Sequence, residues 1–306
     1  MIISASRRTD IPSYYSDWFF RRLEAGFVCT RNPMNPKQVS RISLSLDVVD
    51  GIVFWTKNPT PMLDKLHLLN CYPFYFQFTL NAYGKDLEAG IPSKNDVIIP
   101  AFQKLSQQTG PERIIWRYDP IILTPKYTTE YHVHYFEKLA KRLSGHTQKC
   151  IISFVDLYRH VGKQFTPLGE NEIYELAGRF SDIACKYNLK LETCAESIDL
   201  SQFGIGHGHC IDGELLERII VQPLSLSKDK NQREECGCVS SIDIGMYDSC
   251  LNGCKYCYAN HSAAAVQKNF HLHDPSSPLL FGGIGPDDLV KDRAMESCKA
   301  HQMKLL

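Results

Sequence analysis

Short runs of β-branched and aromatic residues recur along the chain, at intervals that leave room for a helix between them. Runs of this kind predict buried β-strands. We expect strands over Ile2 to Ser6, Gly51 to Thr56, Phe74 to Leu80, Arg113 to Tyr118, Cys150 to Asp156, Lys190 to Thr193 and Val239 to Ile244. The stretches between them have apolar residues at helical spacing behind residues that can open a helix. We expect helices over Asp17 to Glu24, Pro61 to Leu69, Asn95 to Gln108, Thr129 to Leu143 and Glu170 to Tyr187.

This alternation predicts an α/β fold with a mainly parallel sheet and right-handed crossovers. With this many repeats, we expect closure into a whole or partial (β/α) barrel rather than an open sheet. Residues 27–44 depart from the pattern, because the turn Asn32-Pro33-Met34-Asn35-Pro36 between β-prone flanks predicts an inserted hairpin. No linker or repeat divides the sequence, so we expect a single domain over residues 1–306.

Charge and composition argue against several classes of partner. The 34 Lys plus Arg residues balance the 34 Asp plus Glu residues, so no net field favours nucleic acid or an anionic membrane. The apolar runs are far shorter than the ~20 residues that span a bilayer. The opening Met1-Ile2-Ile3-Ser4 lacks the basic and apolar regions of a secretory signal, and we therefore expect a cytoplasmic protein.

Polar residues follow most of the predicted strands directly. Parallel strands end at one edge of a sheet, and the loops that follow them are the usual place for chemistry. Several of these ends carry charges beside Trp55, Trp116 and Tyr118, which favours a shared pocket over the ordinary hydration of single strand ends. The ends are Ser6 to Asp10, Thr56 to Pro59, Thr79 to Asn81, Arg117 to Asp119, Asp156 to Tyr158 and Thr193 to Glu196.

The twelve cysteines are concentrated in one segment, since seven of them lie between Cys194 and Cys257. Thiols in the cytosol are kept reduced, so metal chemistry explains this number better than disulfides do. Cys250, Cys254 and Cys257 follow the last predicted strand with the spacing CxxxCxxC. Sulfurs at these offsets can bind one [4Fe–4S] cluster and leave one iron open, with Gly253 providing the turn.

Other assignments of the cysteines remain open. The loop could instead bind zinc with Cys236 or Cys238 as fourth ligand, or its thiols could be reduced and structural. A second site, an auxiliary iron–sulfur cluster or zinc, has the candidate ligands Cys194, Cys210, Cys236 and Cys238. His207 and His209 are further candidates, although a loop position explains them better. We expect the remaining cysteines to be inert thiols, namely Cys29, Cys71, Cys150, Cys185 and Cys298.

The motif Cys250-x3-Cys254-x-Tyr256-Cys257 resembles the cluster motif of the radical S-adenosylmethionine superfamily, in which three cysteines hold a [4Fe–4S] cluster. The whole chain also resembles an uncharacterised bacterial family, catalogued as a domain of unknown function, whose C-terminal cysteines are similar to that superfamily's N-terminal ones. The segments that carry this resemblance are Ser4 to Pro12, Phe54 to Pro59, Cys236 to Cys238 and Tyr256 to Asn260.

The position of the cysteine loop departs from the superfamily, whose cluster loop follows the first barrel strand. A circular permutation reconciles the two, because the strand over Val239 to Ile244 then takes the first position, beside the strand over Ile2 to Ser6. In that arrangement the three sulfurs share a cavity with Arg7, Lys57 and Arg117. The superfamily's Gly-Gly-Glu segment has no counterpart after the second-position strand, so its contacts to adenosylmethionine do not carry over directly.

The resemblance implies an enzyme that binds S-adenosylmethionine beside the cluster. Such an enzyme takes one electron from a reductant such as ferredoxin or flavodoxin, and generates a 5′-deoxyadenosyl radical that abstracts hydrogen from an unknown substrate. Cations suited to the cofactor's carboxylate are Arg7, Arg8, Lys57 and Arg117. Polar groups suited to its ribose are Asp10, Asn58, Asp119 and Glu196, with Tyr256 beside the cluster. Salt bridges at a barrel mouth are the alternative interpretation of these residues.

Two other functions compete with this hypothesis. In the first, zinc or a redox-sensing cluster in the cysteine-rich segment, residues 194–260, stabilises a non-catalytic metalloprotein. The extra cysteines favour it. In the second, the protein repairs a nucleic-acid lesion, by analogy with spore photoproduct lyase, but the neutral charge gives this hypothesis no support.

Overall fold

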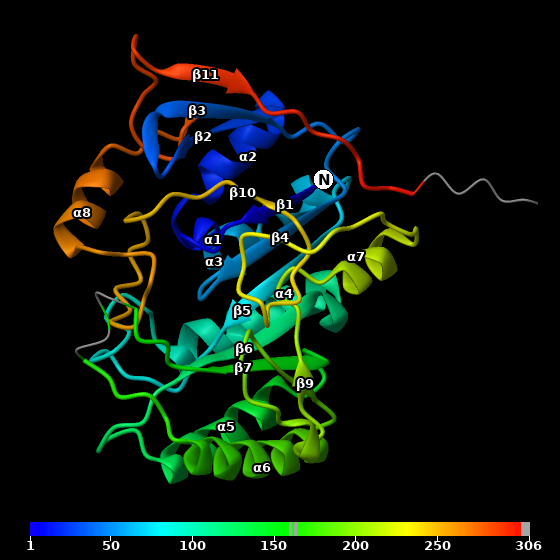
Figure 1. The fold of residues 1–306 in the computed structure, drawn as a ribbon, viewed down its shortest axis with the longest axis vertical. Helices are drawn as coiled ribbons and strands as arrows, with labels where there is room; N and C mark the ends of the chain where they lie inside the picture. Colours follow the sequence, from blue (N-terminus) through cyan, green and yellow to red (C-terminus); the bar gives the residue numbers. More distant parts are fainter. Residues whose placement is uncertain (159–160, 162–163, 301–306) are drawn as a thin grey trace, which may run out of the picture.

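The computed structural model describes residues 1–158, 161 and 164–300. Its main sheet has eight strands in the order β10-β1-β4-β5-β6-β7-β8-β9, and every neighbouring pair is parallel (Figure 1). The strands are β1 (Ile2–Ala5), β4 (Gly51–Thr56), β5 (Phe74–Thr79), β6 (Ile114–Ile121), β7 (Lys149–Phe154), β8 (Lys190–Thr193), β9 (Gly206–His207) and β10 (Ile242–Asp243). The prediction of an α/β fold with a parallel sheet is confirmed.

A smaller sheet of three strands lies beside α2 (Figure 1). Its antiparallel hairpin, β2 (Phe27–Asn32) and β3 (Asn35–Ser43), confirms the hairpin that the sequence predicts over residues 27–44. The third strand, β11 (Leu289–Asp292), pairs with β3 in parallel and was not predicted. All four residues of β11 are exposed, so no alternation of buried and polar positions marks it in the sequence.

Eight α-helices connect the strands within the described residues. They are α1 (Ile11–Tyr14), α2 (Ser16–Ala25), α3 (Thr60–Leu63), α4 (Ile99–Thr109), α5 (Thr129–Leu143), α6 (Glu170–Lys186), α7 (Gly213–Ile220) and α8 (Ala263–His271). Single turns add η1 (Leu66–Leu69), η2 (Lys94–Ile98), η3 (Pro111–Arg113) and η4 (Ser201–Phe203). The helix predicted over Pro61 to Leu69 is therefore divided, because Leu66 and Leu69, three residues apart, are both buried by a 3-10 turn. None of the helices described has the length and apolarity needed to cross a bilayer.

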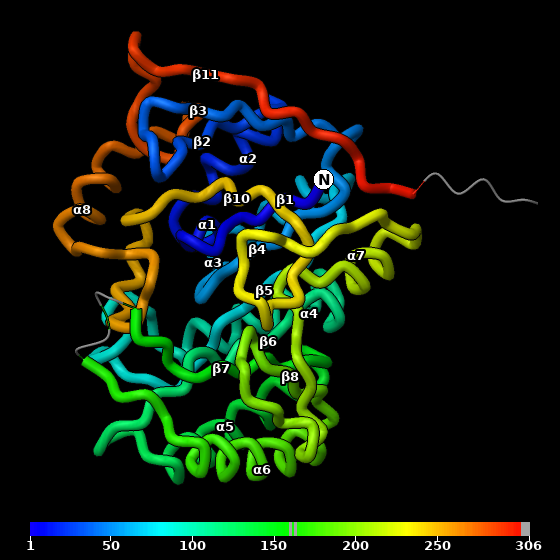
Figure 2. Tube along the Cα trace, viewed as in Figure 1, coloured from blue at the N-terminus to red at the C-terminus, as the bar shows by residue number. Residues whose placement is uncertain are grey.

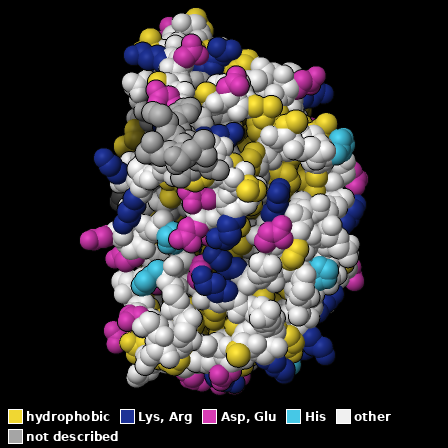
Figure 3. Space-filling view, turned by 90° about the vertical axis from the view of Figure 1, so that its right-hand side faces the viewer, with side chains coloured by type: hydrophobic (Ala, Val, Ile, Leu, Met, Phe, Trp, Pro, Cys, Tyr) yellow, Lys and Arg dark blue, Asp and Glu magenta, His cyan; other side chains and the backbone are white. Residues whose placement is uncertain are grey.

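The two faces of the main sheet have different partners. On one face, side chains such as Phe54 and Trp116 pack against the covering helices in the main core. On the other face, Val53 and Tyr75 pack with Leu216 of α7 in a separate cluster. Helix α7 therefore packs against this second face of the sheet. Seen from the right-hand side of Figure 1, basic and acidic side chains lie next to one another on the surface (Figure 3).

The sheet is open, which corrects the expectation of a complete barrel. Within the described residues, β9 and β10 are its edges and do not pair with each other. Each is only two residues long. The strand predicted over Val239 to Ile244 is reduced to β10, because two of its N–H groups bond elsewhere. Val239 N–H donates to the carbonyl of Ile211 at 3.1 Å, and Ser240 N–H donates to that of Ser227 at 2.8 Å.

Strand β10 lies beside β1, where the permutation argument places it. The two strands run side by side although most of the chain separates them (Figure 2). The Asp243 carboxylate reinforces the junction by accepting hydrogen bonds from the hydroxyls of Ser4 (3.0 Å) and Ser6 (2.6 Å) and from the N–H of Arg7 (2.8 Å). The cysteine loop that follows β10 consequently begins at the carboxyl edge of the sheet.

Candidate functional site

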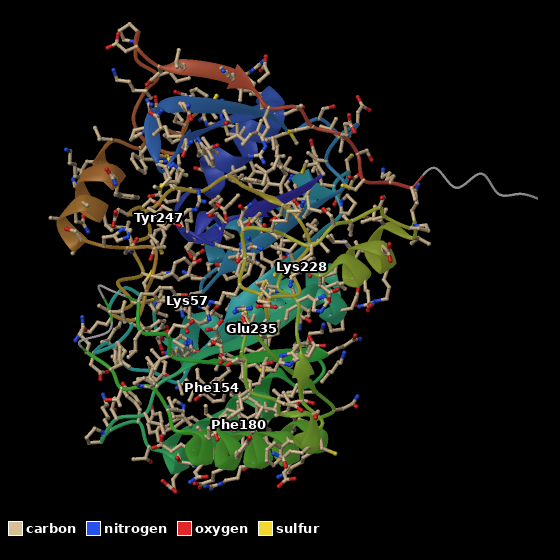
Figure 4. The ribbon with its side chains drawn as sticks, viewed as in Figure 1. Lys57, Phe154, Phe180, Lys228, Glu235 and Tyr247 are labelled. Carbon is tan, nitrogen blue, oxygen red and sulfur yellow. The ribbon has the colours of Figure 1, made fainter. Side chains whose placement is uncertain are left out.

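A cavity of about 570 Å³ lies at the carboxyl ends of the parallel strands. Three residues of its wall show how separate elements build it: Lys57 follows β4, Phe154 ends β7, and Tyr247 follows β10 (Figure 4). Seven cysteines line this cavity, namely Cys194, Cys210, Cys236, Cys238, Cys250, Cys254 and Cys257. They are the seven that the sequence singles out as candidate ligands. The five other cysteines, which are all described, are not part of the wall.

The loop with the CxxxCxxC spacing brings three of these thiols together. Gly253 has a φ of 63°, a left-handed conformation that favours glycine, and it turns the chain between Cys250 and Cys254. Burial raises the pKa of all three thiols, that of Cys254 to about 12. The charge of a neighbouring thiolate at Cys257 raises the pKa of Cys250 and Cys254 further. Three thiolates here would repel one another, and a cation bound between them would remove that repulsion.

The segment after β5 holds the cysteine loop in place through its backbone. Gly90 N–H donates to the carbonyl of Asn252 at 2.9 Å, and Lys255 N–H donates to that of Leu87 at 3.0 Å. The two backbones approach closely at Gly90, where a Cβ atom would lie 2.4 Å from the carbonyl oxygen of Leu251. This contact requires glycine, so the loop position depends on residue 90 as well as on the cysteines.

Lys57 lies in a buried ionic network beside this loop. Its ammonium donates to Glu88 Oε1 at 2.8 Å and to the hydroxyl of Tyr256 at 2.9 Å, and Tyr256 donates in turn to Glu88. Lys94 pairs with the other carboxylate oxygen of Glu88. Burial alone would raise the pKa of Glu88, but the two ammonium groups outweigh it and lower the pKa to about 2. Glu88 therefore stays ionised, with Lys57 as its cationic partner at the cavity wall.

Asp10 connects three parts of the wall. Its buried carboxylate accepts hydrogen bonds from the N–H of Lys57 (2.8 Å), the side-chain amide of Asn252 (3.0 Å) and the N–H of Ser13 (3.1 Å). Burial raises the pKa of Asp10 above its ordinary value, against the effect of these donors. The segment after β1, the end of β4 and the cysteine loop are thus fixed to one another through a single carboxylate.

The other four cysteines of the wall form a second group. Cys194 Sγ lies 3.0 Å from Cys210 Sγ, and interaction with the thiols of Cys210 and Cys236 lowers the pKa of Cys238. Arg117 Nη1 donates to Cys210 Sγ at 2.8 Å. The hydrogen bond from Cys210 lowers the pKa of Cys194 to about 7, against the effect of burial and with the help of Arg117. This group is built from segments that follow β8 and β9 and precede β10.

Several buried polar atoms on the wall have no hydrogen-bond partner among the described residues. They are Arg7 Nη2, Thr9 Oγ1, Trp55 Nε1 and Asn260 Oδ1. The Trp55 ring also lies near two guanidinium groups, with centroid distances of 5.7 Å to Arg7 and 5.2 Å to Arg117. Because buried polar groups are nearly always hydrogen-bonded, these atoms indicate that the cavity accommodates a polar ligand.

Two other predicted residues on the wall already have partners in the protein. Asp119 forms an ion pair with Arg117 and accepts a hydrogen bond from Ser153. Arg8 lies over the ring of Tyr247, 4.9 Å from its centroid. Both residues line the cavity, as the sequence analysis expects, and their roles toward a cofactor remain predictions.

Some predicted residues lie outside the wall. Asn58 turns its side chain toward the start of α3, where it accepts a backbone hydrogen bond. Glu196 accepts a hydrogen bond from Phe154 N–H at 2.9 Å, and burial raises its pKa to about 7. His207 and His209 are likewise not among the lining residues. The expectation that site residues follow parallel strands identifies the correct edge of the sheet. It cannot decide whether the side chain of each polar residue points into the cavity.

The family of this chain follows from a comparison with family models. A model described as a domain of unknown function (DUF1848) matches residues 2–259. The chain belongs to this family. The matched residues include all seven cysteines of the cavity and end shortly after Cys257.

Comparisons with individual proteins add little to this assignment. No curated protein matches the chain. One solved structure, a candidate alpha-L-fucosidase from Bacteroides thetaiotaomicron, shares 12% sequence identity over 73% of this chain and 83% of its own. Its TM-score is 0.27, so the similarity carries no argument about fold or function.

The cysteines of the wall are suitable metal ligands by their chemistry, although their side chains are not arranged as a complete metal site. In the described part of the chain, no group of three or more His, Cys, Asp or Glu side chains has the arrangement of a finished metal site. The CxxxCxxC thiols nevertheless lie close enough to shift one another's pKa, and they share the cavity with the orphaned polar atoms. Soft thiolate donors favour zinc or iron–sulfur clusters over hard cations that prefer oxygen ligands.

Sequence reasoning missed three residues that hold the site. Glu88 lies in a loop well beyond the end of β5, Asn252 lies between two cysteines, and Asp243 ends a very short strand. The position of Asp243 is a usable signal, because it lies near the carboxyl end of a strand predicted beside Ile2 to Ser6, and polar residues at strand ends are the ones considered as site residues. No local pattern marks Glu88. Its partners Lys57 and Tyr256 are 31 and 168 positions away, and only Lys94 is near it in the sequence.

Proposed function

We propose that this protein is an iron–sulfur protein with radical S-adenosylmethionine-like chemistry, in which Cys250, Cys254 and Cys257 bind a [4Fe–4S] cluster. The observation that carries the proposal is the shared cavity: the three cysteines line the same wall as Arg7 and Lys57, at the carboxyl ends of parallel strands. A cluster with three protein ligands keeps one iron open, which is the arrangement of a catalytic rather than a structural site.

The strand order supports this proposal. Strand β10 leads directly into the cysteine loop and pairs with β1, as the first and second strands of a circularly permuted barrel would. In this interpretation the sheet is an incomplete barrel, whose cluster loop follows the first-position strand although it comes late in the sequence. The opening between β9 and β10 is then the seam of the barrel.

When bound, the cluster would supply one electron to the sulfonium of S-adenosylmethionine, whose C5′–S bond breaks to give methionine and the radical that removes hydrogen from the substrate. The protein's part is to bind and orient. Arg7 Nη2 is buried on the wall with no partner among the described residues, so it is suited to the cofactor's carboxylate. Lys57 keeps a positive charge beside Cys254, because Glu88 and the thiol raise its pKa more than burial lowers it. That charge favours thiolates over thiols in the loop.

Anaerobic reconstitution with iron and sulfide tests the first part of the proposal. The wild-type protein should bind iron and sulfide in equal amounts, and it should give the electron paramagnetic resonance signal of a reduced [4Fe–4S] cluster. Cys254→Ala should lose most of both. Cys185→Ala is the matched control, because its thiol is exposed and outside the cavity, and it should behave like the wild type.

The second part is tested by adding S-adenosylmethionine and a reductant, either dithionite or reduced flavodoxin. 5′-Deoxyadenosine and methionine should form in the wild type and in Cys185→Ala, but not in Cys254→Ala. A cluster that is loaded and reducible but never cleaves the cofactor would contradict the enzymatic part and leave the cluster assignment intact.

A non-catalytic metalloprotein is the second candidate. It is favoured by the four further cysteines on the same wall, since so many thiols suit a protein whose metals stabilise it. Purification without oxygen separates the two candidates. Zinc without sulfide, lost when Cys250 is replaced by alanine, would support the structural function and contradict the cluster.

A further inference from the structure

We propose that Cys194, Cys210, Cys236 and Cys238 bind one divalent metal ion of the zinc class in tetrahedral coordination, and that this ion joins the two open edges of the main sheet. The inference goes beyond the proposed cluster chemistry and does not depend on it. It rests on where the four thiols come from, how close their sulfurs lie, and which charges face them.

The four ligands come from opposite sides of the opening in the sheet. Cys194 follows β8 and Cys210 follows β9, whereas Cys236 and Cys238 lie just before β10. The two sides already touch through the backbone. Ile211 N–H donates to Cys238 Sγ at 3.3 Å, and the next residue after Cys238 donates its N–H to the carbonyl of Ile211 at 3.1 Å. An ion held by all four thiols would therefore connect edges that strand pairing leaves unconnected in the described residues.

The spacing of the sulfurs favours a single ion over a second cluster. Cys194 Sγ and Cys210 Sγ are 3.0 Å apart, and Cys238 Sγ, which accepts a hydrogen bond from the N–H of Ile211 at 3.3 Å, lines the same cavity wall. Zinc binds thiolates at ~2.3 Å in a tetrahedron, which places neighbouring sulfurs ~3.8 Å apart. In a cubic cluster each cysteine binds a different iron, so its sulfurs lie at separate corners and much farther apart. Contacts between sulfurs are thus typical of ligands that share one ion.

The thiols form a chain of contacts rather than a finished tetrahedron, in agreement with the absence of a complete metal site among the described residues. Binding would replace these contacts with four metal–sulfur bonds. Each thiol releases one proton as it binds, so one divalent ion and four thiols give a tetrathiolate complex with a charge of minus two and four protons. No electron is transferred, and the reaction needs no oxidant.

Two guanidinium groups face this cluster of sulfurs. Arg117 Nη1 lies 2.8 Å from Cys210 Sγ, and Arg7 is close enough to interact electrostatically with Cys238 and Cys210. Each arginine also pairs with a carboxylate, Arg117 with Asp119 and Arg7 with Asp229 at 3.6 Å. The positive charge therefore offsets part of the charge on a tetrathiolate complex, which favours the metal-bound form in a buried position.

Metal and sulfide analysis of the full chain tests the proposal without requiring any variant to fold. Protein purified without oxygen should contain one zinc ion per chain in addition to any iron and sulfide in the CxxxCxxC loop. Exchange of this zinc for cobalt should give the intense visible absorption of tetrahedral cobalt bound to thiolates. Sulfide reports the cluster, and zinc that stays when Cys250 is replaced by alanine reports the second site, so failure of the cluster would leave this assignment unaffected.

Variants then assign the ligands. Cys210→Ser and Cys238→Ser should lose the zinc and the cobalt absorption while the iron and sulfide of the other loop persist. Cys298→Ser is the matched control, because Cys298 packs against the same apolar cluster but lies outside the cavity, and it should keep the zinc. Three results would overturn the proposal: no zinc or cobalt binding by the wild type, sulfide that remains when the CxxxCxxC cysteines are replaced, or a Cys194–Cys210 disulfide in the purified protein.

Discussion

Lys57 and Tyr256, which are 199 positions apart in the sequence, share a hydrogen bond of 2.9 Å beside the cysteine loop. Both also contact Glu88, so the end of β4, the loop after β5 and the CxxxCxxC loop meet in one buried network. A charged network of this kind is stable only when all its members are present, because each removal leaves a buried charge without its partner. The position of the cysteines therefore depends on residues that are not among the candidate metal ligands.

Replacing Lys57 with methionine tests this dependence. Glu88 would keep only Lys94 as a cationic partner, and we expect the free energy of unfolding to fall by roughly 3 kcal/mol. Tyr256→Phe removes only a hydroxyl and should lower it by about 1 kcal/mol. Chemical denaturation at pH 7 measures both. Lys126→Met is the control, since its ion pair with Asp86 is exposed and its loss should have little effect. Equal effects of Lys57→Met and Lys126→Met would contradict the importance of the network.

Gly90→Ala tests the backbone contact that fixes the cysteine loop. The new Cβ would lie 2.4 Å from the carbonyl oxygen of Leu251, so the loop must move away from the segment after β5. We expect a loss of about 2 kcal/mol in unfolding free energy and weaker retention of iron after reconstitution. Gly283→Ala should change neither quantity, because among the described residues no atom beyond its chain neighbours lies within 4 Å of the added Cβ. Unchanged iron retention in Gly90→Ala would show that the loop position does not depend on this contact.

The sequence predicts the strands that form long runs of β-branched and aromatic residues. Strands such as β4 and β5 are buried along nearly their whole length, and they appear where expected. Strands β9 and β10 have two residues each and therefore no such run, and β11 is exposed along its whole length. These edge elements depend on tertiary pairing, which explains why both the opening in the sheet and the third strand of the small sheet were missed.

The candidate site shows the same division. The spacing of the cysteines and the polar residues at the ends of parallel strands identify the cavity wall, because both are local features of the sequence. The orientation of Asn58 and the role of Glu88 depend instead on contacts between distant segments. Glu88 is ionised because Lys57 and Lys94 come together around it, and no window of the sequence contains that arrangement as a pattern.

We expect the buried side chain of His132 to lower the free energy of unfolding in acid. Burial lowers the pKa of this fully buried imidazole to about 4, and its two nitrogens contact the hydroxyl of Tyr118 and the carbonyl of Ile122. The unfolded chain binds the proton near the ordinary value of 6.5, so protonation favours unfolding as the pH falls from 6.5 toward 4. This group alone should remove roughly 3 kcal/mol across that window.

Denaturation of the wild type and of His132→Gln at several pH values isolates this contribution. The glutamine variant can keep hydrogen bonds to its neighbours but does not titrate, so the difference in stability between the two proteins should shrink or reverse as the pH falls. His134→Gln, a change on the same helix, should follow the wild type. A constant difference between the wild type and His132→Gln would show that the imidazole titrates normally.

Arg7 provides the most direct test of how the cavity recognises a ligand. Its Nη2 is buried and has no hydrogen-bond partner among the described residues, although Arg7 also lies near Asp229 and Trp55. A carboxylate of S-adenosylmethionine would satisfy this donor, and a hydrogen bond between charged groups contributes about 1.5–3 kcal/mol. Arg7→Met should therefore weaken binding of the cofactor by roughly 10- to 100-fold.

Equilibrium dialysis of reconstituted protein with S-adenosylmethionine measures this effect, with iron, sulfide and zinc determined on the same samples. Arg8→Met is the matched control, because Arg8 lines the same wall but lies over Tyr247, and its loss should change the affinity much less. Arg7→Lys should recover only part of the affinity, since a lysine cannot form the two parallel hydrogen bonds of a guanidinium group. If Arg7→Met binds the cofactor as tightly as the wild type and holds the same metals, Arg7 Nη2 binds another ligand, and the carboxylate site must be sought elsewhere on the wall.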